Sequence, residues 1–371
     1  MPLSALTKPA TDPTAIFEHF RYHYATELLT VAATDFDLFG RLADGPKSFD
    51  ELRAEIGLAD RAAHVLFTAL RAMGVLTLTD GKLNLTPAAR EHLVPGRYFE
   101  VGGYIGLFAD SPGVRTMAER LRTNRPATAR EDDAGSAYTF KEGTESAMDR
   151  QASARRLTLA LAGRATNVAP YLAANVPLLD SRLLVDVGGG SGIYAIACVQ
   201  QNPNLRAVVW DRPEVLKVAS EMVDAYGVAD RVELVAGDMF ADPFPAGADA
   251  ILLSNVLHDW DVPDCRKILR RCADALPAGG RVLIHDVFLD DDLGGPLAVA
   301  LYSAGLFVLT EGRAYSAAEY REWLRDAGFT PAERVVPTLV HCGVLEGRPG
   351  LVSRDAETSR SGARKADAPG T

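Results

Sequence analysis

The first candidate site is a glycine-rich turn near the middle of the chain. The apolar run LLVDV at 183–187 precedes GGGSG, and the helical pattern IYAIACVQQ follows it. Open α/β sheets bind ligands at such strand-to-helix turns. The turn departs from the dinucleotide fingerprint because Ile193 occupies the third glycine position, and because Asp186 would repel a diphosphate and attract an ammonium group. The turn therefore favours a zwitterionic ligand, held by Gly188, Gly189, Gly190 and Gly192.

Acidic residues also end the next two predicted strands. Asp211 ends AVVWD, where a carboxylate can accept both ribose hydroxyls of an adenosine or can cap the following helix. Asp238 and Met239 follow VELVAG, so that one can accept the adenine amino group while the other packs on the ring. Together with Asp186 these residues describe an adenosine site without phosphates, which S-adenosylmethionine fits.

The next strand runs into SNVLHDWDVPDC, and here the motifs become specific. DVGGGSG, Asp211, GDMF, LHDWD and PAGGRVLIHD follow one another in a characteristic order and spacing. In this the sequence resembles the class I S-adenosylmethionine-dependent small-molecule O-methyltransferases of the caffeic-acid and hydroxyindole type, which include bacterial enzymes of antibiotic biosynthesis. The resemblance extends from about Ala15 to Gly347. It implies methylation of a phenolic hydroxyl of an aromatic small molecule by a homodimer.

The resemblance also implies the roles of individual residues. His258 matches the general base and Asp286 the carboxylate that supports it, while Asp259 and Trp260 match residues that line the cofactor. Ser254 stands where the plant enzymes have lysine and is included with the cofactor residues. A phenol has a pKa of about 10 and imidazolium about 6.5, so the proton transfer is uphill by about 5 kcal/mol unless the site assists it. The residues expected to line the acceptor are Tyr104, Phe108, Met148, Tyr302 and Phe307.

One departure from the family pattern leaves a second reaction open. The family commonly has another glutamate flanking the histidine, whereas the corresponding position in TEGRAYSAAEY is Ala314. Glu311 could substitute only if the loop followed a different path. The alternative to O-methylation is therefore C-methylation of an activated phenolic ring, such as that of a tyrosine-like amino acid, by the same base.

The N-terminal part has the pattern of a winged helix. Residues 15–42 predict one or two amphipathic helices, and residues 47–86 predict helix, turn, longer helix and a hairpin across Asp80-Gly81. A DNA-binding regulator is the rival class, but basic and acidic residues balance between Arg41 and Leu93 and the presumed recognition helix is largely apolar. We therefore expect a dimerisation domain. A noncatalytic relative of the family is the remaining alternative.

The second part alternates strands and helices, which predicts a Rossmann-like, doubly wound, mostly parallel sheet. The expected domain organisation has five segments. These are a loose N-terminus at 1–13, a winged-helix dimerisation domain at 14–101, a helical linker and acceptor region at 102–176, a cofactor-binding domain at 177–347 and a disordered tail at 348–371.

Composition excludes several classes of protein. The formal net charge is −10, which argues against binding to nucleic acid, and no apolar run approaches the roughly 20 residues that a membrane-spanning helix needs. The N-terminus lacks a secretory signal pattern, so a cytoplasmic location is expected. His19, His23 and Glu27 have a spacing that could bind metal, but their aromatic neighbours favour a packed dimer face, and no metal site is predicted.

Overall fold

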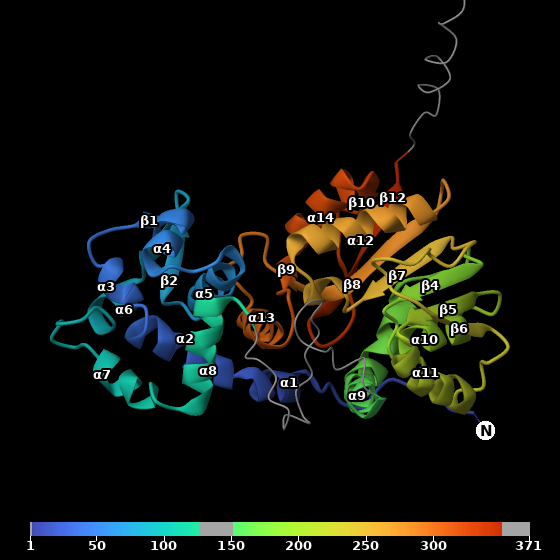
Figure 1. Ribbon diagram of the computed structural model, residues 1–371, viewed down its shortest axis with the longest axis horizontal. Helices are drawn as coiled ribbons and strands as arrows, with labels where there is room; N and C mark the ends of the chain where they lie inside the picture. Colours follow the sequence, from blue (N-terminus) through green and yellow to red (C-terminus); the bar gives the residue numbers. More distant parts are fainter. Residues whose placement is uncertain (1, 126–150, 351–371) are drawn as a thin grey trace, which may run out of the picture.

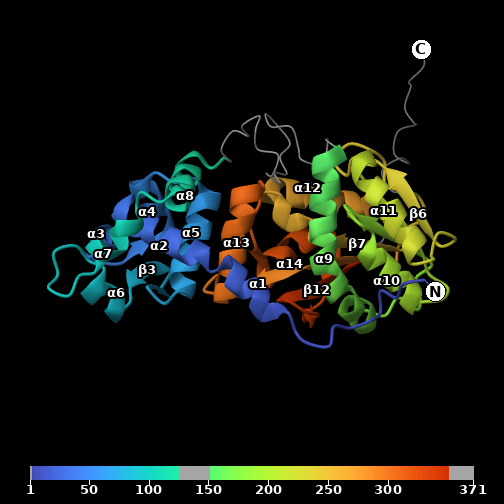
Figure 2. The same ribbon diagram turned by 90° about the horizontal axis from the view of Figure 1, so that it is seen from below.

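The computed structural model describes residues 2–125 and 151–350. A mostly helical N-terminal domain lies beside a larger α/β domain, and helix α13 lies between them (Figure 1). In the α/β domain, helices cover both faces of the sheet (Figures 1 and 2). None of the helices in the described ranges combines the length and apolarity needed to cross a membrane.

The N-terminal domain is built mainly from short helices. In chain order its elements are α1 Thr14–Arg21, α2 His23–Thr34, α3 Leu38–Arg41, β1 Lys47–Ser48, α4 Phe49–Ile56, α5 Asp60–Ala72, β2 Leu76–Thr79, β3 Lys82–Leu85, α6 Pro87–His92, α7 Gly102–Ile105, the 3-10 turn η1 Gly106–Phe108, and α8 Pro112–Thr123.

Local sequence explains the winged-helix unit. Ser48 caps α4 in a reciprocal pair with Glu51, and Gly57 ends that helix in a left-handed conformation. Asp80 and Gly81 both have positive φ, 52° and 73°, which suits the tight turn that joins β2 to β3. The winged-helix prediction is therefore confirmed in its arrangement of helices and hairpin, and β1 adds a third strand beside β3.

The α/β domain follows a long helix. Its elements are α9 Gln151–Asn175, β4 Leu183–Val187, α10 Ile193–Gln201, β5 Arg206–Asp211, α11 Pro213–Ala225, β6 Val232–Ala236, β7 Ala250–Ser254, the 3-10 turn η3 Leu257–Asp259, α12 Val262–Ala275, β8 Arg281–Leu289, α13 Leu297–Leu309, β9 Tyr315–Ser316, α14 Ala317–Asp326, β10 Phe329–Pro331, β11 Val336–Pro337 and β12 Cys342–Pro349.

The central sheet has the strand order β10-β12-β8-β7-β4-β5-β6. Strands β8, β7, β4, β5 and β6 are parallel, whereas β12, toward one edge of the sheet, pairs antiparallel with both β8 and β10. Side chains of a parallel strand are buried on both faces. Leu184 of β4 therefore joins the core beneath α9, α10 and α11, while Val185 joins the core beneath α12 and α14. The predicted doubly wound, mostly parallel sheet is confirmed.

The two chain ends differ from expectation in part. Residues 2–13 were expected to be loose, yet the Leu3 N–H donates to the Ala225 carbonyl, the Ala5 N–H donates to Gln200 Oε1, and Ala5 is buried. The attachment arises because Ala5 packs against the apolar core around α10. At the other end β12 continues to Pro349, so the first residues of the expected tail belong to the sheet; the rest, from residue 351, lies outside the described residues.

Candidate active site

The glycine turn is shaped by backbone conformation. Gly188, Gly190 and Gly192 have φ of 63°, 58° and 73°, values that L-residues with side chains rarely adopt. The Gly190 N–H donates to Asp211 Oδ2 at 2.8 Å, so the carboxylate at the end of β5 fixes the turn that follows β4. A Cβ at Gly189 would lie 2.9 Å from Asp186 Cγ, which means that the turn closes directly over that carboxylate.

Asp186 is a buried carboxyl group that no side chain among the described residues neutralises, and the nearby backbone N–H of Ala195 only partly offsets the rise in its pKa. It is fully buried, and neither of its oxygens has a hydrogen-bond partner among the described residues. Burial, together with repulsion from Asp211, raises the pKa of Asp186 to about 8. An uncompensated carboxylate beneath an open glycine turn fits a cationic ligand group, such as the ammonium group of S-adenosylmethionine.

The other predicted cofactor residues lie after the neighbouring parallel strands. Asp211 ends β5, and its Oδ1 accepts from the Arg212 N–H at 2.6 Å; burial raises the pKa of this carboxyl. Asp238 follows β6, and its Oδ1 accepts from the Phe240 N–H at 2.7 Å. Met239 is partly buried against the core beneath α12. The carboxyl ends of parallel strands share one edge of the sheet, so these groups and the glycine turn face the same rim.

His258 and Asp286 form a buried pair. His258 lies in η3 after β7 and is 3% exposed; Asp286 lies in β8 and is 0% exposed. His258 Nδ1 is 2.5 Å from Asp286 Oδ1. The carboxylate also accepts from the Val287 N–H at 2.8 Å and from the Tyr320 hydroxyl at 3.1 Å. Asp286 is thus held from three sides, and it fixes the imidazole in turn.

This contact leaves one ring nitrogen of His258 for a substrate. With Nδ1 engaged by Asp286, the lone pair of the neutral imidazole is on Nε2, 3.7 Å from Asp259 Oδ1. Burial lowers the pKa of His258, but the charge and hydrogen bond of Asp286, with Asp259, outweigh it and leave the pKa above the usual value. Burial raises the pKa of Asp259 to about 6.

The segment 310–312 packs against the backbone of residues 257–260, which carry His258 and are called the histidine loop below. A Cβ at Gly312 would lie 2.2 Å from the His258 carbonyl oxygen, and the Glu311 N–H donates to the Asp259 carbonyl at 3.1 Å. Arg61 of α5 donates from Nη1 to the carbonyls of Thr310 and Gly312, at 2.8 and 3.1 Å. The N-terminal domain therefore reaches the histidine loop through this segment, a contact that sequence motifs did not indicate.

The position that matches the missing glutamate lies in the protein interior. Ala314 is fully buried, and its N–H donates to Ser303 Oγ at 3.1 Å. Glu311 is attached to the histidine loop through its backbone, as described above. The flanking residues Ser254 and Trp260 are engaged within the protein: Ser254 Oγ lies 2.7 Å from His285 Nδ1, and the Trp260 carbonyl accepts from the Tyr315 hydroxyl at 2.7 Å.

The residues predicted to line the acceptor do not lie together in the structure. Tyr302 lies edge-on to His258, with ring centroids 5.7 Å apart. Phe307 is buried beneath the guanidinium of Arg61, at 4.6 Å. Tyr104 and Phe108 are 74% and 54% exposed and do not join the site of their own chain, because α7 and η1 pack on α2 of the N-terminal domain. Met148 lies outside the described residues.

The possible metal ligands near the N-terminus do not share one continuous helix. The helix ends at Arg21 and a new one begins at His23, which divides the spacing of His19, His23 and Glu27. His23 Nδ1 lies 3.0 Å from the Phe20 carbonyl oxygen. Residues 2–125 and 151–350 contain no group of three potential metal ligands.

A parallel sheet with a glycine turn after its first strand, acidic residues at successive strand ends and a buried His-Asp pair defines the class I S-adenosylmethionine-dependent methyltransferase fold. The profile of the O-methyltransferase domain family matches residues 138–330, and the chain belongs to this family. The family uses S-adenosylmethionine, and the protein is accordingly an S-adenosylmethionine-dependent methyltransferase.

Individual relatives match over most of their length. The chain is 40% identical to 3-hydroxy-5-methyl-1-naphthoate 3-O-methyltransferase of Streptomyces sahachiroi, over 84% of this chain and 88% of that protein. It is 30% identical to L-tyrosine C(3)-methyltransferase of Streptomyces lavendulae, over 81% and 82% of the two chains. An O-methyltransferase family 2 protein from Planctomyces limnophilus, solved in complex with apigenin, superposes with a TM-score of 0.84 at 48% identity, covering 94% of this chain and 99% of that one.

Proposed function

We propose that the protein methylates a phenolic oxygen of an aromatic small molecule, with His258 as general base and Asp286 as the residue that positions it. The observation that carries the proposal is the 2.5 Å contact between His258 Nδ1 and Asp286 Oδ1, which leaves Nε2 as the accepting nitrogen beside Tyr302. S-adenosylmethionine supplies the electrophilic methyl group when it is bound.

The residues of the site would reduce the cost of the proton transfer. Nε2 would accept the hydroxyl proton while the phenolic oxygen takes the methyl group; the bond from the methyl carbon to the sulfonium sulfur breaks, and its electron pair leaves with neutral S-adenosylhomocysteine. Asp286 would stabilise the imidazolium so formed. The raised pKa of His258 narrows the difference of about 5 kcal/mol between a free phenol and a free imidazole. Positioning of the acceptor in line with the methyl group supplies most of the remaining acceleration.

The cofactor would be held by the residues at the sheet rim. Asp186 is suited to the ammonium group, and Asp211 to the ribose hydroxyls, because each is a carboxylate close to the turn. Asp238 and Met239 would contact the adenine, and Asp259 and Trp260 the region around the sulfonium. Ser254, at the end of β7, would support the site through its neighbours, because its hydroxyl is already paired with His285.

The names of the relatives indicate the size of the acceptor. One relative acts on a hydroxylated naphthoate and another was solved with apigenin, so we propose a fused-ring phenol of antibiotic or pigment biosynthesis. C-methylation is the second candidate. It is favoured by the alanine at position 314, which lacks the second carboxylate of the family pattern, and by the tyrosine C(3)-methyltransferase among the relatives.

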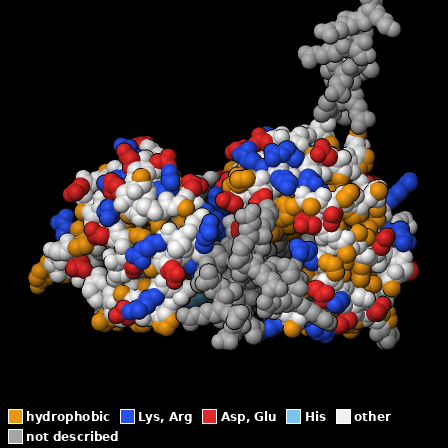
Figure 3. All heavy atoms as spheres, viewed as in Figure 1, with side chains coloured by type: hydrophobic (Ala, Val, Ile, Leu, Met, Phe, Trp, Pro, Cys, Tyr) orange, Lys and Arg blue, Asp and Glu red, His pale blue; other side chains and the backbone are white. Residues whose placement is uncertain are grey.

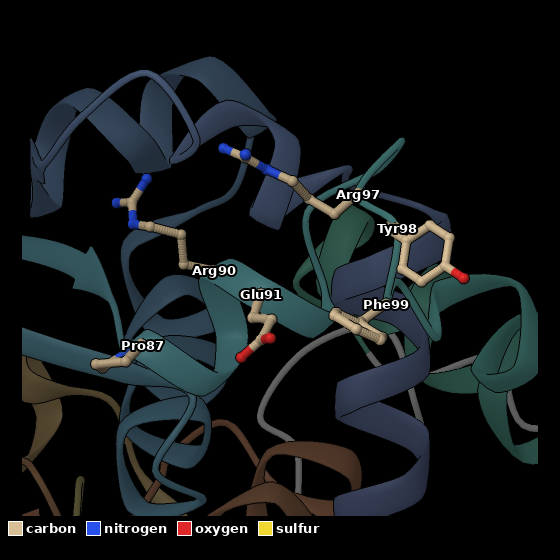
Figure 4. A pocket seen from close by; sticks show the side chains of 6 residues that line it. All are labelled: Pro87, Arg90, Glu91, Arg97, Tyr98 and Phe99. Carbon is tan, nitrogen blue, oxygen red and sulfur yellow. The ribbon is translucent and has the colours of Figure 1, made fainter.

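We further propose that two copies of the chain associate through their N-terminal domains. Apolar side chains are exposed on α1 and between α6 and η1: Ile16 71%, Phe20 74%, Tyr98 94%, Phe99 57%, Tyr104 74%, Leu107 74% and Phe108 54%. Figure 4 shows Tyr98 and Phe99 beside Arg97 at a shallow hollow that α6 also lines. Elsewhere, Figure 3 shows acidic and basic side chains interspersed over both domains on the face drawn.

In such a dimer Tyr104 and Phe108 would line the acceptor site of the partner subunit, which is the role expected of them from the sequence. Sedimentation equilibrium at micromolar concentration tests this. We expect the wild-type protein to be a dimer and Tyr104→Asp to weaken its association. The control is Leu161→Asp, at an exposed position on α9, which should leave the dimer intact. A wild-type protein that is monomeric throughout would contradict the shared site.

The reaction itself is tested with cofactor labelled with carbon-13 in its methyl group. The enzyme is incubated with a panel of naphthols, hydroxynaphthoates, flavones and tyrosine, and the products are examined by carbon-proton correlation NMR. A methoxyl signal is the expected result. An aryl-methyl signal would replace O-methylation by C-methylation, and the absence of any new methyl signal over the whole panel would overturn the proposed acceptor class.

A further inference from the structure

Two arginine side chains lie around the aromatic ring that faces the base. The Arg21 guanidinium carbon is 4.0 Å from the centre of the Tyr302 ring, and that of Arg164 is 5.7 Å from it. The same ring lies 5.7 Å from the ring centroid of His258. The arginines come from α1 and α9, which lie far apart in the sequence, so only the fold brings their charges to this site.

Arg21 has no anionic partner. It is 6% exposed and makes no hydrogen bond or ion pair with any other described residue. Its guanidinium group lies over the rings of Phe17 and Tyr302. Burial lowers the pKa of Arg21, as expected of a cation removed from water without compensation. A guanidinium group has five N–H donors, and no donor of Arg21 is used by a described residue, so these donors are available to a ligand.

Arg164 is held only by neutral groups. Its Nη1 donates to Asn255 Oδ1 at 2.9 Å, its Nη2 donates to Cys342 Sγ at 2.9 Å, and its Nε is buried without a partner. The carboxylate of Asp286 acts on Arg164 electrostatically, but its ion pair is with His258. Two described carboxylates, Asp286 and Asp259, lie near Tyr302, but their ion-pair contacts are with His258, and neither forms an ion pair with Arg21 or Arg164.

Resting on the proposed function, we infer that the acceptor is an aromatic acid, whose carboxylate is bound by Arg21 with support from Arg164 while its hydroxyl faces His258. A carboxylate matches the planar fork of a guanidinium and makes charge-assisted hydrogen bonds with it. A neutral phenol would leave both guanidinium groups without an ion-pair partner. The site therefore selects hydroxylated aryl carboxylates over the corresponding phenols without the acid group.

The inference is tested by combining enzyme variants with matched acceptors. The acceptors are a hydroxynaphthoate and the naphthol that lacks only its carboxylate, and kcat/KM is measured for wild type, Arg21→Gln and Arg21→Lys. We expect Arg21→Gln to lower kcat/KM by about 10- to 100-fold for the acid, the range of a lost hydrogen bond to a charged group, and by less than about twofold for the naphthol. Arg21→Lys should restore part of the preference because it retains the charge.

The matched control is Arg122→Gln, which removes an arginine that also lies over a ring, at 5.4 Å from Phe36, but is paired with Asp35 away from the site. It should leave both rates unchanged. Equal losses with both acceptors in Arg21→Gln would overturn the inference, because the arginine would then act on the phenolic oxygen or on the structure. A wild-type preference for the naphthol would overturn it as well.

A binding measurement separates this inference from the proposed reaction. Naphthoate without a hydroxyl cannot be methylated, so its dissociation constant is measured by titration calorimetry in the presence of S-adenosylhomocysteine. Binding that weakens about 10-fold or more in Arg21→Gln supports the carboxylate site even if no phenol is methylated. Methylation of phenols with no dependence of naphthoate binding on Arg21 would leave the reaction standing and overturn the inference. If Arg21→Gln does not fold, Arg164→Gln is measured in the same two assays and decides in the same way.

Discussion

His258 Nδ1 lies 2.5 Å from Asp286 Oδ1, and both side chains are buried. The two residues are brought together by neighbouring parallel strands, because Ser254 at the end of β7 pairs with His285 of β8. Tyr320 and the Val287 N–H hold the carboxylate in place. The tautomer and direction of the imidazole are therefore set before any substrate binds.

The first prediction concerns the pH dependence of kcat/KM. In the proposed mechanism His258 acts as a base in its neutral form, and its pKa is raised, so activity should increase with pH through a value above the usual 6.5 or so. Asp286→Asn removes the charge that raises this pKa. The rising limb should then move to lower pH by about one unit or more, while the maximum rate falls. A limb that stays in place in Asp286→Asn would mean that another group titrates.

The second prediction concerns proton release on cofactor binding. Asp186 has a pKa of about 8, so at pH 7 its carboxyl is mostly protonated in the free protein. An ammonium group nearby favours the carboxylate, so binding should release a proton and affinity should increase as pH rises toward 8. Calorimetry of S-adenosylhomocysteine binding in buffers of different ionisation enthalpy measures the proton count. Asp186→Asn should abolish the buffer dependence; its persistence would assign the proton to another group.

The third prediction concerns the close packing of Gly312 on the histidine loop. In Gly312→Ala the new Cβ would lie 2.2 Å from the His258 carbonyl oxygen and 2.6 Å from the Trp260 backbone nitrogen, so the backbone has to move. We expect kcat/KM to fall by about 100-fold, the effect of displacing a catalytic group by about 1 Å. The matched control is Gly163→Ala, an exposed helical position with no atom within 4 Å of the new Cβ. Comparable losses in both variants would refute the packing argument.

Much of the sheet could be predicted because parallel strands are short apolar runs. LLVDV coincides with β4, and RVLIHDV begins where β8 begins. The strand that runs into SNVLHDWDVPDC is β7, and it ends at Ser254 because Asn255 takes a left-handed φ of 56°. The antiparallel edge β12 was not predicted, since its pairing with β8 joins residues far apart in the sequence.

The residues of the site likewise fall into those that a local sequence motif indicates and those that only the fold brings together. His258, Asp286 and the glycine turn lie in motifs that are local in sequence, so their types and order indicated them. Tyr320, Arg21 and Arg164 lie in ordinary helical segments, and only tertiary packing brings them to the catalytic pair or to Tyr302. No local pattern distinguishes a residue that lines its own subunit's site from one that reaches the partner's.

The central claim, that His258 removes the phenolic proton, is tested most directly by comparing two acceptors of similar shape whose hydroxyl pKa values differ. One is an ordinary phenol with a pKa of about 10, and the other carries electron-withdrawing groups and is ionised at neutral pH. His258→Ala should lower kcat by about 100- to 10,000-fold for the first and far less for the second, with cofactor affinity unchanged in both cases. Equal losses for the two acceptors, or full activity of His258→Ala toward the first, would contradict the role of general base.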